Sequence, residues 1–297
     1  MPHPPLITVI TPCFNDGATL PMALASLVAQ TVEDWECIVV DDGSGRSVAP
    51  IVEAFGERRI ELLTFGRNRG RSVARQRALE RARGDYICML DADDWYYPEK
   101  LERQLAVMDE HRRLAAVSSG LAVMDGDDQL VGMRSHNPSK LEIHIGEKAR
   151  FPGLPFPSVM LRRSVALAES FDPRLQRSED LEYLMRVLEG RRYGVMAESL
   201  YAYREVFSDE SMGEALSGFR NQRKVFGGQI GEAPLRAGRQ YLWSLVKSGI
   251  YGAARATARG RWLFARRNRA PTAEERRAFA VSRSKVRRSL EEITGLR

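Results

Sequence analysis

Short apolar runs alternate with helical segments over the first ninety residues, and this alternation most constrains the fold of the chain. After the first run, apolar residues recur at helical spacing at Leu20, Leu24 and Leu27. The apolar runs are residues 6–10, 37–40, 60–65 and 86–90. Strands that alternate with helices form a mostly parallel sheet with helices on both faces. We therefore expect an α/β fold.

Acidic residues directly follow two of these runs. Asp41 comes after the second run, whereas Asp91, Asp93 and Asp94 come after the fourth, just before Trp95. Ligands bind outside the carboxyl ends of parallel strands, so these side chains are expected to meet at one edge of the sheet. Mg²⁺ and Mn²⁺ are commonly shared between one or two carboxylates and a substrate diphosphate. The pattern predicts a site for a divalent cation and phosphates.

The acidic triplet alone is compatible with other interpretations, of which a plain surface turn is one. An EF-hand loop needs glycine at its sixth position, where this chain has Tyr96, so a calcium-storage site is disfavoured. A dinucleotide site needs a glycine-rich turn after the first strand, and residues 11–15 do not form one. A phosphatase or phosphotransferase that attacks with an aspartate stays open at this point.

The rest of the chain predicts more strands, a covering loop and a helical C-terminus. Strands are expected at 115–124, 129–133, 158–161 and 194–203, and helices at 98–112, 163–169 and from Ser178 onward. A poorly periodic loop is expected at 135–157, with His136 and His144 in it. Beyond residue 211 only helices are expected, near 214–225, 235–264 and 272–293. Thr272, followed three residues later by Glu275, fits a capping box.

Charge is unevenly distributed along the 297 residues. Residues 234–297 contain 16 Lys and Arg against 4 Asp and Glu, whereas residues 1–233 contain 29 against 35. Arginines interleaved with aromatic residues favour an anionic membrane surface as the partner of residues 235–288. An anionic glycan and a merely solvated helical face are the alternatives, and no nucleic acid is expected.

No segment of the sequence predicts export or insertion into a membrane. The N-terminus lacks the basic region of a signal peptide. The most apolar stretch, 241–254, contains Lys247 and falls short of the roughly 18 residues of a membrane span. The isolated Cys13, Cys37 and Cys88 lack the spacing of a zinc site or a disulfide framework. We expect a cytoplasmic protein, peripheral on the inner face of the membrane if its basic segment binds lipid.

Six motifs occur in order between residues 6 and 207. They are TVITPCFNDGATL, VVDDGS, NRGRSVARQRAL, GDYICMLDADDWYYPEKL, SFDPRL followed by SEDLEYLMR, and LYAYR. In order and spacing they resemble the inverting glycosyltransferase family 2, whose members use nucleotide-diphosphate sugars and contain a DXD motif. The resemblance implies the GT-A fold, a Rossmann-like mixed sheet with flanking helices, here with a C-terminal helical extension.

The resemblance also implies which residues bind the nucleotide. Thr11, Pro12 and Asn15 would border the base, and Asp41 would form a hydrogen bond to it. Arg75 would lie near the base and the phosphates. These five residues come from three separate segments. The resemblance therefore also predicts that the fold brings these segments together.

The resemblance also implies chemical roles for three further carboxylates. Asp91 would approach the ribose, and Asp93 would hold Mn²⁺ or Mg²⁺ against the diphosphate. Asp180, in the first turn of a helix, matches the catalytic base. A cation on the leaving diphosphate and a base on the opposite side of the sugar suit a single displacement that inverts the anomeric centre.

Four neighbouring charged residues keep two interpretations each. Asp42 is interpreted as a turn or capping residue rather than a ligand, and Asp94 as either a support of its neighbours or a helix cap. Glu179 is interpreted as a solvated acid at a helix start, with orientation of Asp180 as the alternative. Arg186 could reach the diphosphate or form a structural ion pair.

The function implied is a metal-dependent hexosyl- or N-acetylhexosaminyltransferase of cell-surface polysaccharide or glycoconjugate synthesis. The donor would be a UDP-sugar, or else a dTDP- or GDP-sugar, and the acceptor a hydroxyl of a glycan or a lipid-linked glycan. The expected organisation is a donor half (1–112), an acceptor and catalytic-base half of the same domain (113–233) and a basic helical extension (234–297). The rivals are a catalytically silent nucleotide-sugar-binding scaffold at the membrane and a same-fold nucleotidyltransferase, although the glycine-rich phosphate loop of the latter is missing.

Overall fold

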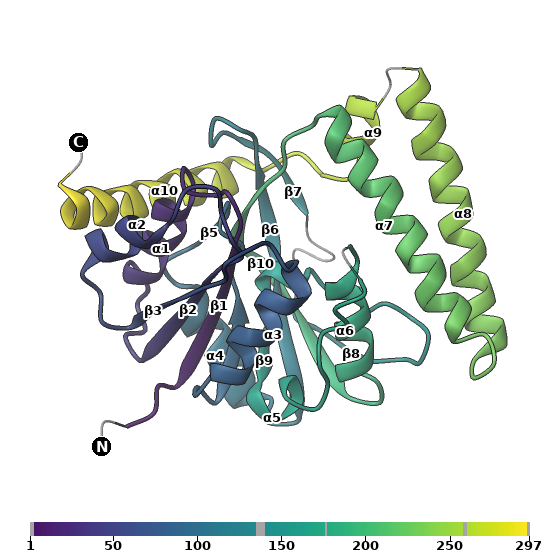
Figure 1. Ribbon diagram of the computed structural model, residues 1–297, viewed down its shortest axis with the longest axis horizontal. Coiled ribbons are helices and arrows are strands. Elements are labelled where there is room, and N and C mark those ends of the chain that lie inside the picture. Colours follow the sequence, from purple (N-terminus) through teal and green to yellow (C-terminus); the bar gives the residue numbers. More distant parts are fainter. Residues whose placement is uncertain (1–2, 135–139, 176, 258–259, 296–297) are drawn as a thin grey trace.

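Ten strands form one mixed sheet in the computed structural model, which describes residues 3–134, 140–175, 177–257 and 260–295 (Figure 1). The strand order is β3-β2-β1-β4-β9-β6-β10-β5, with β7 beside β6 and β8 beside β10. Helices flank the sheet, so the predicted fold class is confirmed.

The first four strands are parallel neighbours: β1 (Ile7–Cys13), β2 (Trp35–Asp41), β3 (Ile60–Thr64) and β4 (Tyr86–Met89). Helices α1 (Leu20–Val28), α2 (Ala49–Phe55) and α3 (Arg71–Arg81) connect them. Side chains alternate between the two faces, so that Val9 enters the core under α1 and Ile10 enters the core under α3. The predicted alternation of strands and helices is confirmed.

The second half of the sheet is joined to the first through an antiparallel strand. β9 (Met160–Arg162) lies between β4 and the long strand β6 (Leu114–Met124), and β10 (Arg192–Arg204) runs parallel to β6. The remaining elements are β5 (Trp95–Tyr96), α4 (Lys100–Glu110), β7 (Leu130–Arg134), β8 (Glu142–Ile145), the 3₁₀ turn η1 (Phe156–Ser158), α5 (Arg163–Ala166) and α6 (Glu179–Val187).

The prediction of one long loop at 135–157 is wrong for residues 142–145. Glu142–Ile145 forms β8, which pairs with β10, with His144 opposite Tyr193. This edge strand is only four residues long and mostly exposed, so its sequence carries little apolar alternation. Residues 135–139, which include His136, lie outside the described residues.

Four helices complete the chain: α7 (Asp209–Gly228), α8 (Pro234–Ala256), α9 (Gly260–Ala265) and α10 (Ala273–Thr294). The predicted single helix over 235–264 is therefore wrong, because α8 ends at Ala256 and a separate short helix begins at Gly260. The predicted capping box is confirmed, since the Thr272 amide donates to Glu275 Oε2 (2.9 Å) and the Glu275 amide to Thr272 Oγ1 (3.2 Å). No helix among the described residues is long and apolar enough to cross a bilayer.

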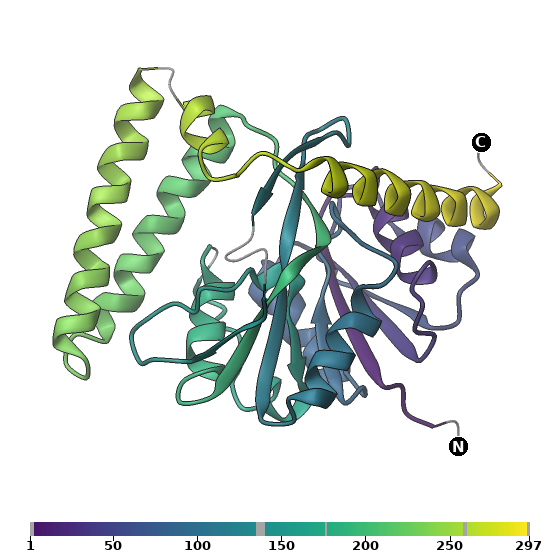
Figure 2. The same ribbon diagram turned by 180° about the vertical axis from the view of Figure 1, so that it is seen from behind.

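The basic C-terminal segment, residues 234–297, is divided between two sides of the molecule (Figure 2). α8 pairs with α7, whereas α10 crosses the sheet domain beside α1 and α2. The ring of Phe279 packs on those of Trp95 and Tyr97, with centroids 5.2 and 6.3 Å apart. α10 is thus part of the core behind the acidic segment, and the sequence alone did not predict this contact.

One buried cation lies close behind the sheet edge. Lys100 is fully buried, and its Nζ donates to Gln104 Oε1 (2.7 Å) and lies 4.0 Å from the centroid of the Tyr96 ring. Burial, which disfavours the charged ammonium group, lowers the pKa of Lys100 to about 8.

This buried lysine predicts a rise in stability with pH. Between the folded pKa of about 8 and the unfolded value near 10.5, the unfolded chain binds more protons, so the free energy of unfolding increases as pH rises. From about pH 7 to about pH 9.5 the contribution of Lys100 is about 2 kcal/mol. We expect urea denaturation to show this difference between the wild type and Lys100→Met. Parallel pH profiles of the two proteins would contradict the assignment.

Candidate functional site

The carboxyl ends of β1, β2 and β4 bring the predicted acidic residues to one edge of the sheet. Cys13 at the end of β1 lies opposite Asp41 at the end of β2. Met89 at the end of β4 lies opposite Ile10, so Asp91 follows just beyond the same edge. Segments from distant parts of the sequence therefore converge, as the pattern of acidic strand ends predicted.

Asp41 and Asp42 differ in what their carboxylates contact. Asp41 is buried, and its Oδ1 accepts a hydrogen bond from the Ser44 amide (2.9 Å). The Asp42 carboxylate accepts hydrogen bonds from the amides of Arg69 (2.7 Å) and Gly70 (2.8 Å) at the start of α3. The interpretation of Asp42 as a turn or capping residue is confirmed, because it ties the loop after β2 to the loop before α3.

The loops after β1 and β2 are also joined to each other. The Asn15 amide donates to Ser44 Oγ (2.9 Å), and Asn15 Oδ1 accepts from the Gly45 amide (2.9 Å). Asn15 has a φ of 63°, a left-handed conformation that asparagine tolerates well. Gly43 has a φ of 74°, and a Cβ at this position would lie 2.3 Å from the carbonyl carbon of Arg67. Only glycine allows this close approach of the loop after β2 to the loop between β3 and α3.

Thr11 and Pro12 form the last part of β1. Thr11 is fully buried, and its hydroxyl lies 3.6 Å from the Cys37 sulfur inside the sheet. Pro12 is half-buried beside it. The Thr11 side chain is therefore directed into the core, so a nucleotide at this edge would meet the loop that follows rather than the Thr11 hydroxyl.

Asp94 links the acidic segment, residues 91–94, to strand β10. It is buried, its Oδ2 accepts from the Tyr201 hydroxyl (2.8 Å), and its Oδ1 accepts from the Arg204 amide (2.7 Å). The same hydroxyl accepts from the Asp91 amide (3.1 Å), and Arg204 Nε donates to the Asp93 carbonyl oxygen (3.0 Å). β10 thus holds the backbone of the acidic segment in place, and of the two interpretations of Asp94 the supporting one is confirmed.

The carboxylates of Asp16, Asp91 and Asp93 interact electrostatically at this edge of the sheet. Burial, with repulsion from Asp91 and then Asp16, raises the pKa of Asp93 to about 6. Burial, with a contribution from repulsion by Asp91, also raises the pKa of Asp16. The charge of Arg71 acts to lower the pKa of both Asp16 and Asp93. Asp16 was missed as a site residue in the sequence, although its place in the loop after the first strand could have indicated it.

The chemistry of these donors fits a hard divalent cation. Carboxylate oxygens are the preferred ligands of Mg²⁺ and Mn²⁺, and a cation would relieve the repulsion that raises the pKa of Asp93. Among the described residues no three His, Cys, Asp or Glu side chains are arranged to hold a metal by themselves. The remaining ligands of such a cation would therefore come from water or from a bound diphosphate.

Arg75 links the acidic segment to α6. Its guanidinium is buried and pairs with Asp91 Oδ1 (3.0 Å) and Glu179 Oε1 (2.7 Å), 4.8 Å from the centroid of the Phe156 ring. Burial acts to lower the pKa of Arg75, but the carboxylates of Asp91 and Glu179 outweigh it and raise the pKa. The interpretation of Glu179 as a solvated acid is wrong, since the residue is only 3% exposed. Sequence alone could not show this, because its partner Arg75 lies 104 positions away.

Asp180 follows Glu179 in the first turn of α6, as predicted. Burial, with repulsion from Glu179, raises the pKa of Asp180 to about 6, whereas the charge of Arg75 acts to lower it. Asp91 also contributes to the rise, so the predicted base belongs to the same electrostatic cluster as the acidic segment. Ser178, which precedes this turn, has a φ of 60°.

Arg186 lies further along α6 and has its own partners. Its guanidinium forms ion pairs with Glu182 (2.5 Å) and Glu169, and it donates a hydrogen bond to the Ser170 carbonyl oxygen (2.6 Å). Of the two interpretations, the structural ion pair is confirmed. The structure therefore joins Asp91, Arg75 and Asp180 in one cluster and leaves Arg186 outside it.

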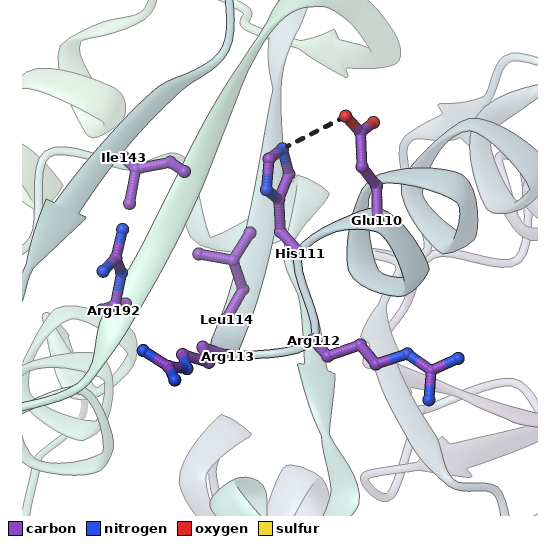
Figure 3. Close-up of a pocket in the computed structure, with 7 residues that line it drawn as sticks. All are labelled: Glu110, His111, Arg112, Arg113, Leu114, Ile143 and Arg192. Carbon is purple, nitrogen blue, oxygen red and sulfur yellow. Dashed lines mark ion pairs between the residues drawn. The ribbon is translucent and has the colours of Figure 1, made fainter.

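Two cavities lie away from this cluster. One, of about 300 Å³, is lined by the end of α4 and the first residues of β6 and β10, which form the opposite edge of the sheet (Figure 3). In Figure 3, His111 faces Glu110, with 4.0 Å between His111 Nε2 and Glu110 Oε1. The other, of about 760 Å³, lies between the outer side of α3, the end of β3 and residues 170–173. Neither cavity contains a predicted site residue.

Comparison with known proteins gives a match in sequence to one family model. The model described as glycosyl transferase family 2 matches residues 8–167.

Among the relatives is a Bacillus subtilis protein named for teichuronic acid biosynthesis, TuaG, which is 36% identical over 46% of this chain and 55% of its own length. The glycosyltransferase EpsE of the same organism is 31% identical over 68% of this chain and 73% of its own length. WfgD of Escherichia coli, named as a UDP-Glc:α-D-GlcNAc-diphosphoundecaprenol β-1,3-glucosyltransferase, is 37% identical over 35% of this chain and 41% of its own length. The chain thus spans about half the length of the first and last of these relatives.

Solved structures are similar in fold. TarS residues 1–349 from S. aureus in complex with UDP superpose with a TM-score of 0.60 at 17% identity, covering 97% of this chain and 90% of that one. The mannosyltransferase PcManGT of Pyrobaculum calidifontis, in complex with GDP-Man and Mn²⁺, also gives a TM-score of 0.60 at 17% identity, covering 99% and 88%. At this identity the likeness concerns the fold alone.

Proposed function

Because the chain belongs to glycosyl transferase family 2, we propose that it moves a hexose or N-acetylhexosamine from a nucleotide-diphosphate sugar to an acceptor hydroxyl, with inversion at the anomeric carbon. The observation that carries the proposal is the single electrostatic cluster formed by Asp91, Asp93, Arg75 and Asp180 at the carboxyl edge of the sheet. A donor site and a base in one cluster are what a one-step displacement requires.

In this proposal residues 1–112 bind the donor. Asp41 and the joined loops around Pro12 and Asn15 receive the base, and Asp91 approaches the ribose. Asp93 holds Mn²⁺ or Mg²⁺ against the diphosphate, and a divalent cation, when bound, neutralises charge on the leaving nucleoside diphosphate. The pairing of Arg75 with Asp91 supports a position of its cation beside the diphosphate, although Nη1 and Nη2 already have carboxylate partners and only Nε has none.

Residues 113–233 receive the acceptor and carry the base. The Asp180 carboxylate removes the proton of the acceptor hydroxyl while that oxygen forms a bond to the anomeric carbon. The bond from this carbon to the diphosphate oxygen breaks on the opposite side, which inverts the centre. With a pKa of about 6, Asp180 is mostly deprotonated at neutral pH and is still basic enough to accept a proton in the transition state.

The relatives guide the choice of donor and acceptor. A UDP-sugar is the favoured donor because TarS binds UDP and WfgD is named for UDP-Glc, with dTDP- and GDP-sugars as alternatives. A lipid-linked or polymeric glycan is the favoured acceptor, in the synthesis of a cell-surface polysaccharide or glycoconjugate. The enzyme would work in the cytoplasm, with its basic C-terminal segment at the inner face of the membrane.

A panel of nucleotide-sugars tests the proposal. At about a hundred times Kd, the correct donor with Mn²⁺ should raise the Tm by about 5 °C, and release of the nucleoside diphosphate should follow. Asp93→Asn should remove the part of the shift that depends on Mn²⁺. Asp109→Asn, the same change at an exposed position of α4, should not alter the shift.

The outcomes separate the rival functions. Stabilisation independent of metal would remove the assigned role of Asp93. Binding without any sugar transfer or hydrolysis would indicate a silent scaffold, and stabilisation by nucleoside triphosphates alone would indicate a nucleotidyltransferase.

A further inference from the structure

Helix α8 carries a row of exposed apolar side chains, with Arg239 between the first and second of them. Each member is 47 to 89% exposed, and the row consists of Leu235, Leu242, Trp243, Val246 and Ile250. With 3.6 residues per turn, these spacings place all five on one side of the helix over most of its 23 residues. Single exposed apolar residues are ordinary, but a contiguous row on one face indicates a partner.

The hairpin with α7 does not need this face. The other side of α8 buries Ala237 and Ser244. There Arg223 of α7 donates to Ser248 Oγ (2.7 Å), and the ring of Phe219 packs edge-on against Tyr251 with centroids 5.1 Å apart. Both views place α8 at the outermost side of the molecule, with α7 between α8 and α6 (Figures 1 and 2). The exposed row therefore faces outward.

The charge of α8 indicates what covers the row. The helix contains four cations and no Asp or Glu: Arg236, Arg239, Lys247 and Arg255. Arg236 pairs with Glu147 (3.0 Å), whereas Arg239 is exposed within the row itself and makes no ion pair with any described residue. A second copy of the chain would bring cations against cations. An anionic lipid surface instead offers acyl chains to the apolar row, an interface for Trp243 and negative headgroups to the exposed Arg239.

We propose that α8 lies flat on an anionic membrane through the row formed by Leu235, Leu242, Trp243, Val246 and Ile250. The helix is then an interfacial one, about 35 Å long, that does not cross the bilayer. This deepens the membrane contact of the proposed function and changes which residues make it. The sequence indicated residues 235–288 as a whole, but Arg267 and Arg269 in the later part of this range pair with Glu205 (3.3 Å) and Glu275 (2.5 Å).

The docked helix is connected to the predicted base through α7. Asn221 Nδ2 donates to the Arg177 carbonyl oxygen (3.0 Å), and Ser178 Oγ donates to the Gly218 carbonyl oxygen (3.3 Å). These contacts lie immediately before Asp180 in the sequence. Resting on the proposed function, the arrangement places the acceptor side of the site near the membrane, where the hydroxyl of a lipid-linked glycan would be presented.

Vesicle sedimentation with the full chain tests the contact. The wild type should partition onto vesicles of phosphatidylcholine with phosphatidylglycerol and much less onto phosphatidylcholine alone, and salt should weaken the binding. The double variant Leu242→Glu, Val246→Glu should partition at least about tenfold more weakly, since it removes apolar contact and adds two negative charges at the lipid. Val131→Glu with Val281→Glu, equally exposed on β7 and α10, should partition like the wild type.

Three results would overturn the proposal. The first is equal partitioning of the α8 variant and the wild type, and the second is no binding of the wild type to anionic vesicles. The third is a wild-type dimer in light scattering that the α8 variant dissociates, which would assign the row to self-association. Thermal stabilisation by the nucleotide-sugar checks that the variant is folded. It also separates the two proposals, because a chain that binds vesicles but no donor would contradict the proposed function alone.

Discussion

Asp180→Asn is expected to lower the rate of sugar transfer by about a hundred- to ten-thousandfold while changing the donor Kd by less than about threefold. The amide has the shape of the carboxylate but cannot accept the proton of the acceptor hydroxyl. Asp180 comes from α6, whereas the donor loops follow β1, β2 and β4, so donor binding should persist. Calorimetric titration of the donor and a nucleoside-diphosphate release assay measure the two quantities separately.

The pH profile gives an independent measure of the same residue. Since the pKa of Asp180 is about 6, the turnover number at saturating donor and Mn²⁺ should be level above that pH and fall about tenfold per unit below it. In Asp180→Asn this limb should be absent from the residual activity. Glu189→Gln, an exposed carboxylate just beyond the end of α6, is the matched control and should leave both rate and profile unchanged. Equal losses of donor affinity and rate in Asp180→Asn would mean that the residue is structural.

Arg75→Met is expected to lower the free energy of unfolding by about 3–5 kcal/mol, the largest stability effect predicted for a single change. The substitution leaves the Glu179 carboxylate, whose side chain is 4% exposed, without its cation and removes the partner of Asp91 as well. Urea denaturation measures the change. Arg77→Met, two residues along α3 and half-exposed in a 3.6 Å pair with Glu80, should change stability by less than about 0.5 kcal/mol.

A double variant separates the charge effect from the loss of packing. In Arg75→Met with Glu179→Met no uncompensated Glu179 carboxylate remains, so at least about 1–2 kcal/mol of the lost stability should return. If Arg75 also binds the donor, the double variant should regain stability without regaining donor affinity. A loss below about 1 kcal/mol in the single variant would show that the pair does not hold α6 to the acidic segment.

The convergence of residues on the proposed donor side could be predicted because the relevant pattern is local. An apolar run of strand length followed by Asp41, or by Asp91 and Asp93, indicates both a strand and the carboxylates at its C-terminal end. Parallel strands that point the same way then place these ends at one edge, as the register of β1 with β2 and β4 confirms. The family motifs extended this inference to Asp180.

The surroundings of these residues could not be predicted in the same way. Glu179 has the same sequence neighbours whether it is solvated or buried, and only the approach of Arg75 decides between the two. Asp94 is likewise defined by Tyr201 and Arg204, more than a hundred positions away. Long-range pairing leaves no periodicity in either segment, because each partner contributes one polar residue to an otherwise ordinary helix or strand.

The basic C-terminal segment shows the same division between local pattern and tertiary packing. Composition and helical spacing determined that it is helical and cationic, and Thr272 with Glu275 marked the start of α10. Tertiary packing alone decided that α10 joins the core behind Trp95 and that α8 keeps an apolar face outside it. The physical reason is that burial depends on what another segment covers, whereas strand ends, helix caps and charge are properties of neighbouring residues.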